Sequence, residues 1–98
     1  MNGRNGKVIV SRHAGAIEWL RRHGVTGEVV SHVDTDTDLE GKILIGNAPL
    51  WIAAQADEIW TIEMPELPAE LRGKDISAEQ MEELGAKLGR YYVQKLGE

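Results

Sequence analysis

A short and wholly apolar run near the start of the chain limits the possible folds more than any other feature. Residues 8–10 read Val-Ile-Val, and a run without internal polarity is typical of a strand that is buried on both faces of a sheet. A helix is predicted over residues 14–23. Three reactive side chains lie between this strand and the helix: Ser11, Arg12 and His13. We therefore expect a parallel α/β sheet whose function lies at the carboxyl end of its first strand.

The rest of the chain alternates apolar strands with helices. Strands are predicted over 28–33, 43–46 and 58–64, and helices over 50–57 and from Ser77 to near the C-terminus. This alternation implies right-handed crossovers, and a central first strand gives the strand order 2-1-3-4. The 98 residues are thus predicted to form one domain, residues 1–98, with a mainly parallel four-stranded sheet and three helices.

Local signals mark the starts of the helices. Asn47 is expected to cap the second helix, and Ser77 with Gln80 gives a capping-box pattern at the start of the last one. Gly85 and Gly89 lie within that last predicted helix, where each costs about 1 kcal/mol relative to alanine. Close packing against a strand or a partner helix would explain these glycines, and so would simple tolerance.

Composition excludes several classes of function. The chain has no cysteine, which removes disulfides and zinc sites built on sulfur, and we expect no metal and no cofactor. The acidic stretch 34–38 lacks the glycine and glutamate spacing of a calcium loop and is predicted to be a turn. A formal net charge of −5 argues against binding along duplex nucleic acid. Without an apolar run of ~20 residues or a secretory signal, we expect a cytoplasmic protein that binds no membrane.

The predicted strand order brings two segments together at one edge of the sheet. The first strand ends at Ser11, and the third strand leads into four residues: Gly46, Asn47, Ala48 and Pro49. Both segments precede helices at the point where the strand order reverses, which is where open α/β sheets bind ligands. Free backbone N–H groups and helix dipoles favour an anion at such a place.

The side chains at this edge suit a phosphodiester. Arg12 is permanently charged and can contact phosphate in a bidentate way, and an arginine at this place has few structural reasons to be there. Ser11 and Asn47 add neutral donors, and His13 can move a proton. These groups favour cleavage without metal, by in-line attack of the ribose 2′-hydroxyl. Structural alternatives remain for Ser11 as a helix cap and for His13 as a partner of the backbone.

Other polar and aromatic residues have open alternatives. Arg72 and Lys74, on either side of Gly73, are solvated loop charges or a lid over the pocket of the same chain or of a partner. His32 is expected to be a core or face residue rather than a ligand. Trp19 belongs either to the edge of the core or to an interface.

Four segments, in this order, resemble a family of small CRISPR-associated proteins. The segments are Val-Ser-Arg-His-Ala-Gly-Ala-Ile-Glu-Trp-Leu, Val-Val-Ser-His-Val, Ile-Gly-Asn-Ala-Pro-Leu and Leu-Arg-Gly-Lys-Asp-Ile-Ser-Ala-Glu-Gln-Met. Proteins of this family are encoded beside type III CRISPR systems and are similar in size, so the resemblance covers nearly the whole chain. It implies a Rossmann-like, three-layer homodimer and ring nuclease activity, which is the cleavage of cyclic oligoadenylate messengers, above all cyclic tetraadenylate, to linear products.

The resemblance also assigns residues. Its Ser-Arg-His motif falls on residues 11–13 as catalytic groups, and its Leu-Arg-Gly motif falls on residues 71–73, next to Lys74. The third motif departs from the expected Gly-Thr-Leu-Pro, because Asn47 and Ala48 stand at its centre. Two rival hypotheses remain: a non-catalytic sensor or sponge that binds the same nucleotide, and a structural partner of other CRISPR proteins with an empty pocket.

Overall fold

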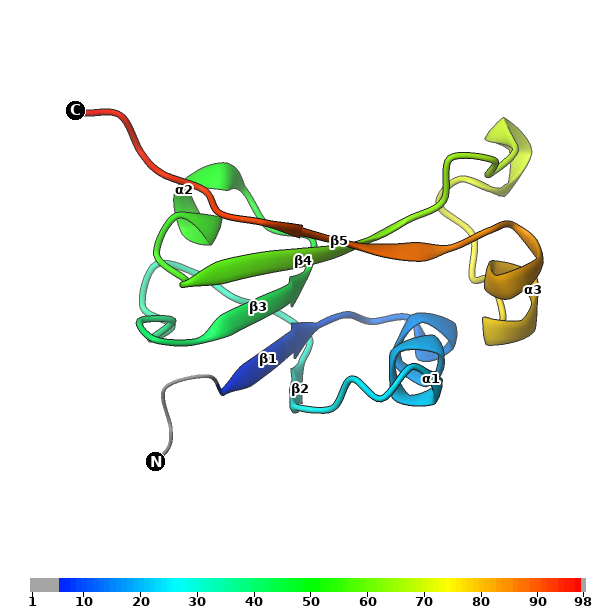
Figure 1. Ribbon diagram of the computed structural model, residues 1–98, viewed down its shortest axis with the longest axis horizontal. Helices are drawn as coiled ribbons and strands as arrows, with labels where there is room; N and C mark the ends of the chain where they lie inside the picture. Colours follow the sequence, from blue (N-terminus) through cyan, green and yellow to red (C-terminus); the bar gives the residue numbers. More distant parts are fainter. Residues whose placement is uncertain (1–5, 98) are drawn as a thin grey trace.

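The computed structural model describes residues 6–97, which form a mixed five-stranded sheet and three α-helices (Figure 1). In chain order the elements are β1 (Lys7–Val10), α1 (Ala14–Arg22), β2 (Glu28–Val30), β3 (Ile43–Gly46), α2 (Leu50–Ala53), β4 (Glu58–Glu63), the 3-10 helix η2 (Ala69–Leu71), α3 (Ala78–Glu83) and β5 (Lys87–Tyr91). The strand order is β2-β1-β3-β4-β5, in which the first four strands pair in parallel and β5 pairs antiparallel with β4. The α/β class is confirmed and the first four strands have the predicted order. The predicted count of four strands is wrong.

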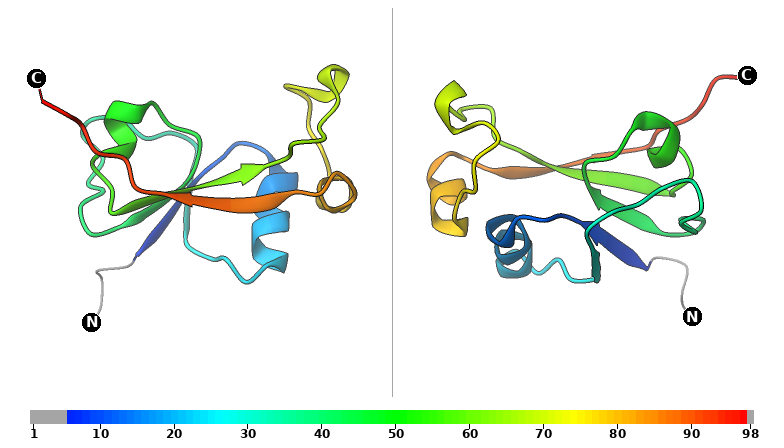
Figure 2. Two further views of the ribbon diagram at one scale, coloured as in Figure 1. Left: turned by 45° about the horizontal axis from the view of Figure 1, so that its top comes forward. Right: turned by 180° about the vertical axis from the view of Figure 1, so that it is seen from behind.

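Each face of the sheet carries its own apolar core, because side chains alternate along each strand. On one face, β1 and β3 pack with residues of α1 and α3: Ile9, Ile43, Ile45, Trp19, Leu20, Ala78 and Met81. On the other face, residues of β1, β3 and β4 pack with α2 and the loop before β3: Val8, Leu44, Ile59, Ile52, Ala53, Val33 and Leu39. The two views of Figure 2 place α1 beside α3 at one end of the molecule and α2 toward the other. Trp19 is buried in the first of these cores, so its core alternative is confirmed.

The last predicted helix is wrong in its second half. α3 ends at Glu83, and Gly85 then has a φ of +75°, a left-handed conformation that residues other than glycine avoid. The chain then turns back as β5, in which Gly89 pairs with Thr61 of β4. The two glycines therefore mark a helix end and a strand, and β5 rather than β4 forms this edge of the sheet.

Two other predicted elements are much shorter in the structure. β2 stops at Val30, and the chain then leaves the sheet so that Val33 can enter the core on the face of α2. α2 has four residues and begins after Pro49, with no side-chain cap. The prediction that Asn47 caps this helix is therefore wrong.

Two local predictions are confirmed. The Ser77 hydroxyl accepts a hydrogen bond from the Gln80 N–H at 3.1 Å, and the Gln80 side chain accepts one from the Ser77 N–H at 3.2 Å, which completes the capping box. Residues 34–38 form a turn in which the Asp34 carboxylate accepts from the Asp36 N–H and the Thr37 hydroxyl. Within residues 6–97, none of the helices has the length and apolar character that a membrane span requires.

Two glycine substitutions should separate backbone strain from a steric clash. Gly85 has a positive φ but open space around its missing Cβ, so Gly85→Ala should cost about 1–2 kcal/mol of unfolding free energy. A Cβ on Gly46 would meet the Val10 carbonyl oxygen at 2.3 Å in addition to a φ of +132°, so Gly46→Ala should cost roughly 3 kcal/mol or more. Urea unfolding followed by circular dichroism measures both. Equal losses for the two variants would contradict the close approach of β3 to β1.

Candidate functional site

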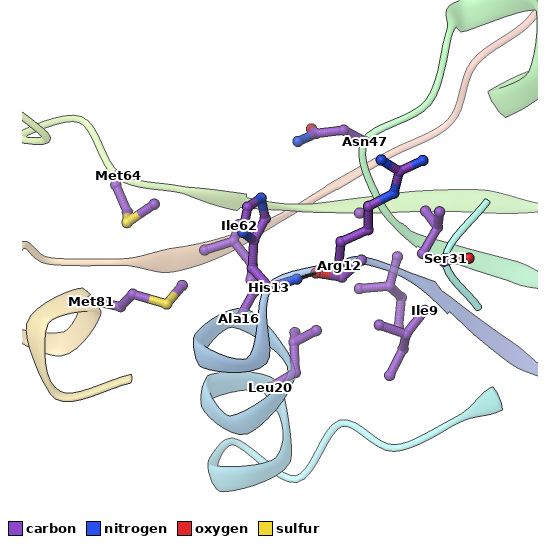
Figure 3. A pocket seen from close by; sticks show the side chains of 14 residues that line it. Ile9, Arg12, His13, Ala16, Leu20, Ser31, Asn47, Ile62, Met64 and Met81 are labelled. Atoms are coloured by element: carbon purple, nitrogen blue, oxygen red, sulfur yellow. Dashed lines mark hydrogen bonds between the residues drawn. The ribbon is translucent and has the colours of Figure 1, made fainter. Parts of the chain in front are cut away.

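A cavity of about 340 Å³ opens where β1 and β3 end (Figure 3). Its polar lining consists of Ser11, Arg12, His13, Ser31 and Asn47. Its apolar lining consists of Ile9, Val10, Ala16, Leu20, Ile45, Gly46, Ile62, Met64 and Met81. Among the described residues, no carboxylate lines this cavity, and Arg12 is its one permanent charge. The cavity therefore suits a ligand that joins an anionic group to a flat or apolar one.

The turn between β1 and α1 fixes the direction of the Ser-Arg-His motif. The Ser11 N–H continues the strand ladder by donating to the Val30 carbonyl at 3.0 Å, and the Ser11 hydroxyl accepts from the His13 N–H at 3.1 Å. His13, not Ser11, is the residue that precedes the helix, so Ser11 stabilises the turn rather than capping α1. Figure 3 shows the side chains of Arg12 and His13 extending from this turn into the cavity.

Arg12 is exposed and makes no hydrogen bond or ion pair with any of residues 6–97. Asn47, which follows β3 on the same side, is also exposed and has no hydrogen-bond partner within that range. A guanidinium and an amide that no protein group engages are both free to donate to an anion. The backbone N–H groups of Ala14 and Gly15, in the first turn of α1, likewise have no partner in the described chain.

His13 has a partner that sequence reasoning missed. Its Nδ1 lies 2.5 Å from the Asp75 carboxylate, so the backbone alternative for His13 is wrong. A carboxylate at Nδ1 fixes the proton on that nitrogen and leaves Nε2 as the atom that can exchange a proton with a ligand. Asp75 directly follows the Arg-Gly-Lys run, and this adjacency was the one signal in the sequence. His13 and Asp75 are 62 residues apart in the sequence, and their contact joins the Ser-Arg-His turn to the loop that follows the Leu-Arg-Gly motif.

The segment that carries Asp75 is held against α1 by close packing. A Cβ on Gly15 would lie 1.8 Å from the Ile76 carbonyl oxygen, so only glycine allows this approach. Ion pairs extend the contact along the helix, since Arg22 joins Glu18 and Glu79, each at 2.8 Å. Hydrogen bonds from Arg21 and Arg22 lower the pKa of Glu18 to about 2, from its usual 4.5.

The remaining predicted site residues lie outside the cavity lining. Ala48 packs against the core on the face of α2. Arg72, Gly73 and Lys74 are exposed in the loop between η2 and α3, where Gly73 has a φ of +80°. Within residues 6–97, this loop contacts the residues of the site through the pair of Asp75 and His13. His32 is exposed rather than part of the core, and its Nε2 lies 3.6 Å from the Asp34 carboxylate.

Comparison with known proteins identifies the family. The family model described as "Putative CRISPR-associated protein (Cas_VVA1548)" matches residues 8–94, which include β1 except for Lys7 and every later element through β5. The chain belongs to this family of CRISPR-associated proteins. No curated protein and no solved structure matches the chain significantly.

The ion pairs of Glu18 predict a pH dependence. Its folded pKa of about 2 lies below its usual 4.5, so its contribution to stability is fully present above pH 4.5 and is lost as the pH falls through 2. Glu18→Gln should therefore be less stable than the parent protein at pH 7, by the small amount expected for an exposed pair, and this deficit should shrink toward pH 2.

Urea unfolding of both proteins across this pH range measures the deficit. Glu66→Gln is the matched control, because Glu66 is exposed and has no ion-pair partner in the described chain. A Glu18→Gln deficit of constant size down to pH 2 would contradict the assignment.

Proposed function

We propose that this protein is a ring nuclease that acts in the cytoplasm and cleaves a cyclic oligoadenylate, most of all cyclic tetraadenylate, in type III CRISPR defence. Membership of a CRISPR-associated family supports the context, and parallel strands with crossover helices on both faces support a Rossmann-like arrangement. The observation that carries the proposal is the meeting of Arg12, His13 and Asn47 at one cavity that no carboxylate of residues 6–97 lines.

The three side chains take separate roles in this reaction. Arg12 neutralises a non-bridging oxygen of the phosphodiester, and the amide of Asn47 orients the same group. The ribose 2′-oxygen attacks phosphorus, loses its proton to solvent, and forms a 2′,3′-cyclic phosphate while the bond from phosphorus to the 5′-oxygen breaks. His13, held by Asp75 through Nδ1, donates a proton from Nε2 to the leaving 5′-oxygen. No step requires a metal ion.

The size of the cavity bears on the assembly. About 340 Å³ is at the lower end of the range for small-molecule sites, which is enough for one phosphodiester with an adjoining nucleotide but not for a ring of four. We therefore propose a homodimer in which each copy engages one linkage of the symmetric ring. The exposed loop of Arg72, Gly73 and Lys74 would then cover the ring from the rim of its own cavity or from the partner copy.

Removal of Arg12 tests the proposal directly. Purified protein, incubated with cyclic tetraadenylate or cyclic hexaadenylate and a chelator, should give linear products at multiple turnover by chromatography. Arg12→Ala should lower kcat/KM by roughly 10²–10³-fold, as for loss of a group that stabilises transition-state charge. Arg21→Ala is the control, because it removes the same charge from α1, the helix that follows Arg12, at a position outside the cavity.

The other outcomes separate the rival functions. Tight binding of a ring that stays intact would contradict nuclease activity and would favour a sensor or sponge. A ring that neither binds nor is cleaved would contradict the assignment of the ligand.

The pair of His13 and Asp75 gives a second prediction. His13→Ala should lower kcat by roughly 10²–10³-fold while KM changes little, because the acid acts on the leaving group rather than on binding. Asp75→Asn keeps the shape of the side chain but removes the charge that selects the tautomer of His13. This variant should also lower kcat, and it should change the pH profile of kcat. A replacement of Asp75 that left both kcat and its pH profile unchanged would contradict its role as a positioning residue.

A further inference from the structure

A second cavity, of about 360 Å³, adjoins the first. Val10, Ser31 and Asn47 line both cavities and form the wall between them. A chain-like ligand with its phosphate at Arg12 therefore has the second cavity as its nearest continuation. The proposed mechanism gives this space no function.

The second cavity presents aromatic side chains at a concave surface. Trp51, on α2, is 55% exposed although tryptophan is normally highly buried, and its side chain lines the cavity together with the ring of His32. Beneath them, Val33 and Ile52 are buried and close the cavity with apolar surface. Aromatic side chains that line an accessible apolar cavity are the usual platform for stacking a nucleobase.

Charge distinguishes the two cavities. Asp34 lines the second cavity, whereas no carboxylate of the described residues lines the first. The turn holds this carboxylate in place, because Oδ1 accepts from the Asp36 N–H at 2.9 Å and from the Thr37 hydroxyl at 3.2 Å. Oδ2 lies 3.6 Å from the Nε2 of His32, at the cavity. A fixed carboxylate repels phosphate but accepts a hydrogen bond from an amino group.

We infer that the second cavity binds the amino-bearing nucleobase next to the phosphodiester at Arg12. Trp51 and His32 stack on the base, and Asp34 accepts a hydrogen bond from its exocyclic amino group. This inference rests on the proposed function and extends it from the phosphate to the base. According to this inference, Asp34 gives the cavity a preference for adenine. A base with a carbonyl group at the same position cannot donate a hydrogen bond to this carboxylate.

The test uses a dinucleotide that cannot be cleaved. The 2′-deoxy dinucleotide of adenine lacks the attacking hydroxyl, and the same dinucleotide with hypoxanthine replaces the amino group with a carbonyl. Binding is followed by titration calorimetry and by the indole N–H signals of the three tryptophans, with the Trp51 signal assigned from Trp51→Phe. Trp60, which lies beneath Arg90 at 4.8 Å, serves as the internal control.

Four results support the inference together. The Trp51 signal shifts saturably while the Trp60 signal does not, Trp51→Ala weakens adenine dinucleotide binding roughly tenfold, and Trp51→Phe retains most of the affinity. Asp34→Asn abolishes the preference for adenine over hypoxanthine. Because Trp51 is largely exposed, its replacement leaves the core intact, and circular dichroism checks this.

The contrary results distinguish the two proposals. In one contrary result, binding depends on Arg12, but the Trp51 signal does not shift and Trp51→Ala keeps the parent affinity. This result would contradict base binding in the second cavity and would leave the proposed function unaffected. Absence of dinucleotide binding, together with intact cyclic rings in the cleavage assay, would overturn both.

Discussion

The parallel pairing of β1 with β3 is the constraint on which the rest of the molecule depends. The two strands lie at the centre of the sheet in a register that sets Val10 beside Gly46, and both have side chains buried on either face. The pairing is close enough that Gly46 has no room for a Cβ, because the Val10 carbonyl occupies that space. In consequence the segments that follow β1 and β3 leave the sheet at the same level, and this places Arg12 and Asn47 at one cavity.

A second contact completes the site from a distant part of the sequence. The segment before α3 lies against the first turn of α1, where Gly15 permits the approach of Ile76, and Asp75 then reaches His13. Buried side chains dominate this contact: each Leu or Met buried between α1 and α3 contributes roughly 1.5–3 kcal/mol, against about 0–1 kcal/mol for an exposed ion pair. The ion pairs of Arg22 therefore adjust a contact that Leu20 and Met81 already hold.

The sequence predicted the parallel part of the fold because each of its signals is local. An apolar run, a turn and a capping box are each recognisable without knowledge of the rest of the chain, and a right-handed crossover then fixes the strand order. Residues 84–91 were mispredicted because Leu84, Leu88 and Tyr91 suit one face of a helix as well as the end of a helix followed by a strand. The decisive feature is the left-handed backbone of Gly85, and two glycines four apart did not reveal it.

In the candidate site, too, the residues that local signals mark were predictable, and those that depend on tertiary packing were not. Ser11, Arg12 and His13 were predictable because they follow a buried strand directly, and Asn47 followed from the strand order. Asp75 was not predictable, because its contact with His13 depends on how α3 docks on α1. The loop of Arg72 and Lys74 was interpreted either as solvated loop charges or as a lid over a pocket, and these residues lie outside the cavity lining.

The distribution of charge favours a small anionic ligand over a polymer. A net charge of −5 repels a long polyanion along its whole length, and binding of a long strand depends on many basic contacts. At physiological ionic strength, however, an exposed charge is screened beyond about 8 Å, so distant carboxylates have little effect on a phosphate held at Arg12. The proposed ring presents one linkage to each cavity, and no carboxylate in the described part of the chain lines that cavity. An overall acidic charge is thus compatible with a small anionic ligand at Arg12, although it disfavours a long polyanion.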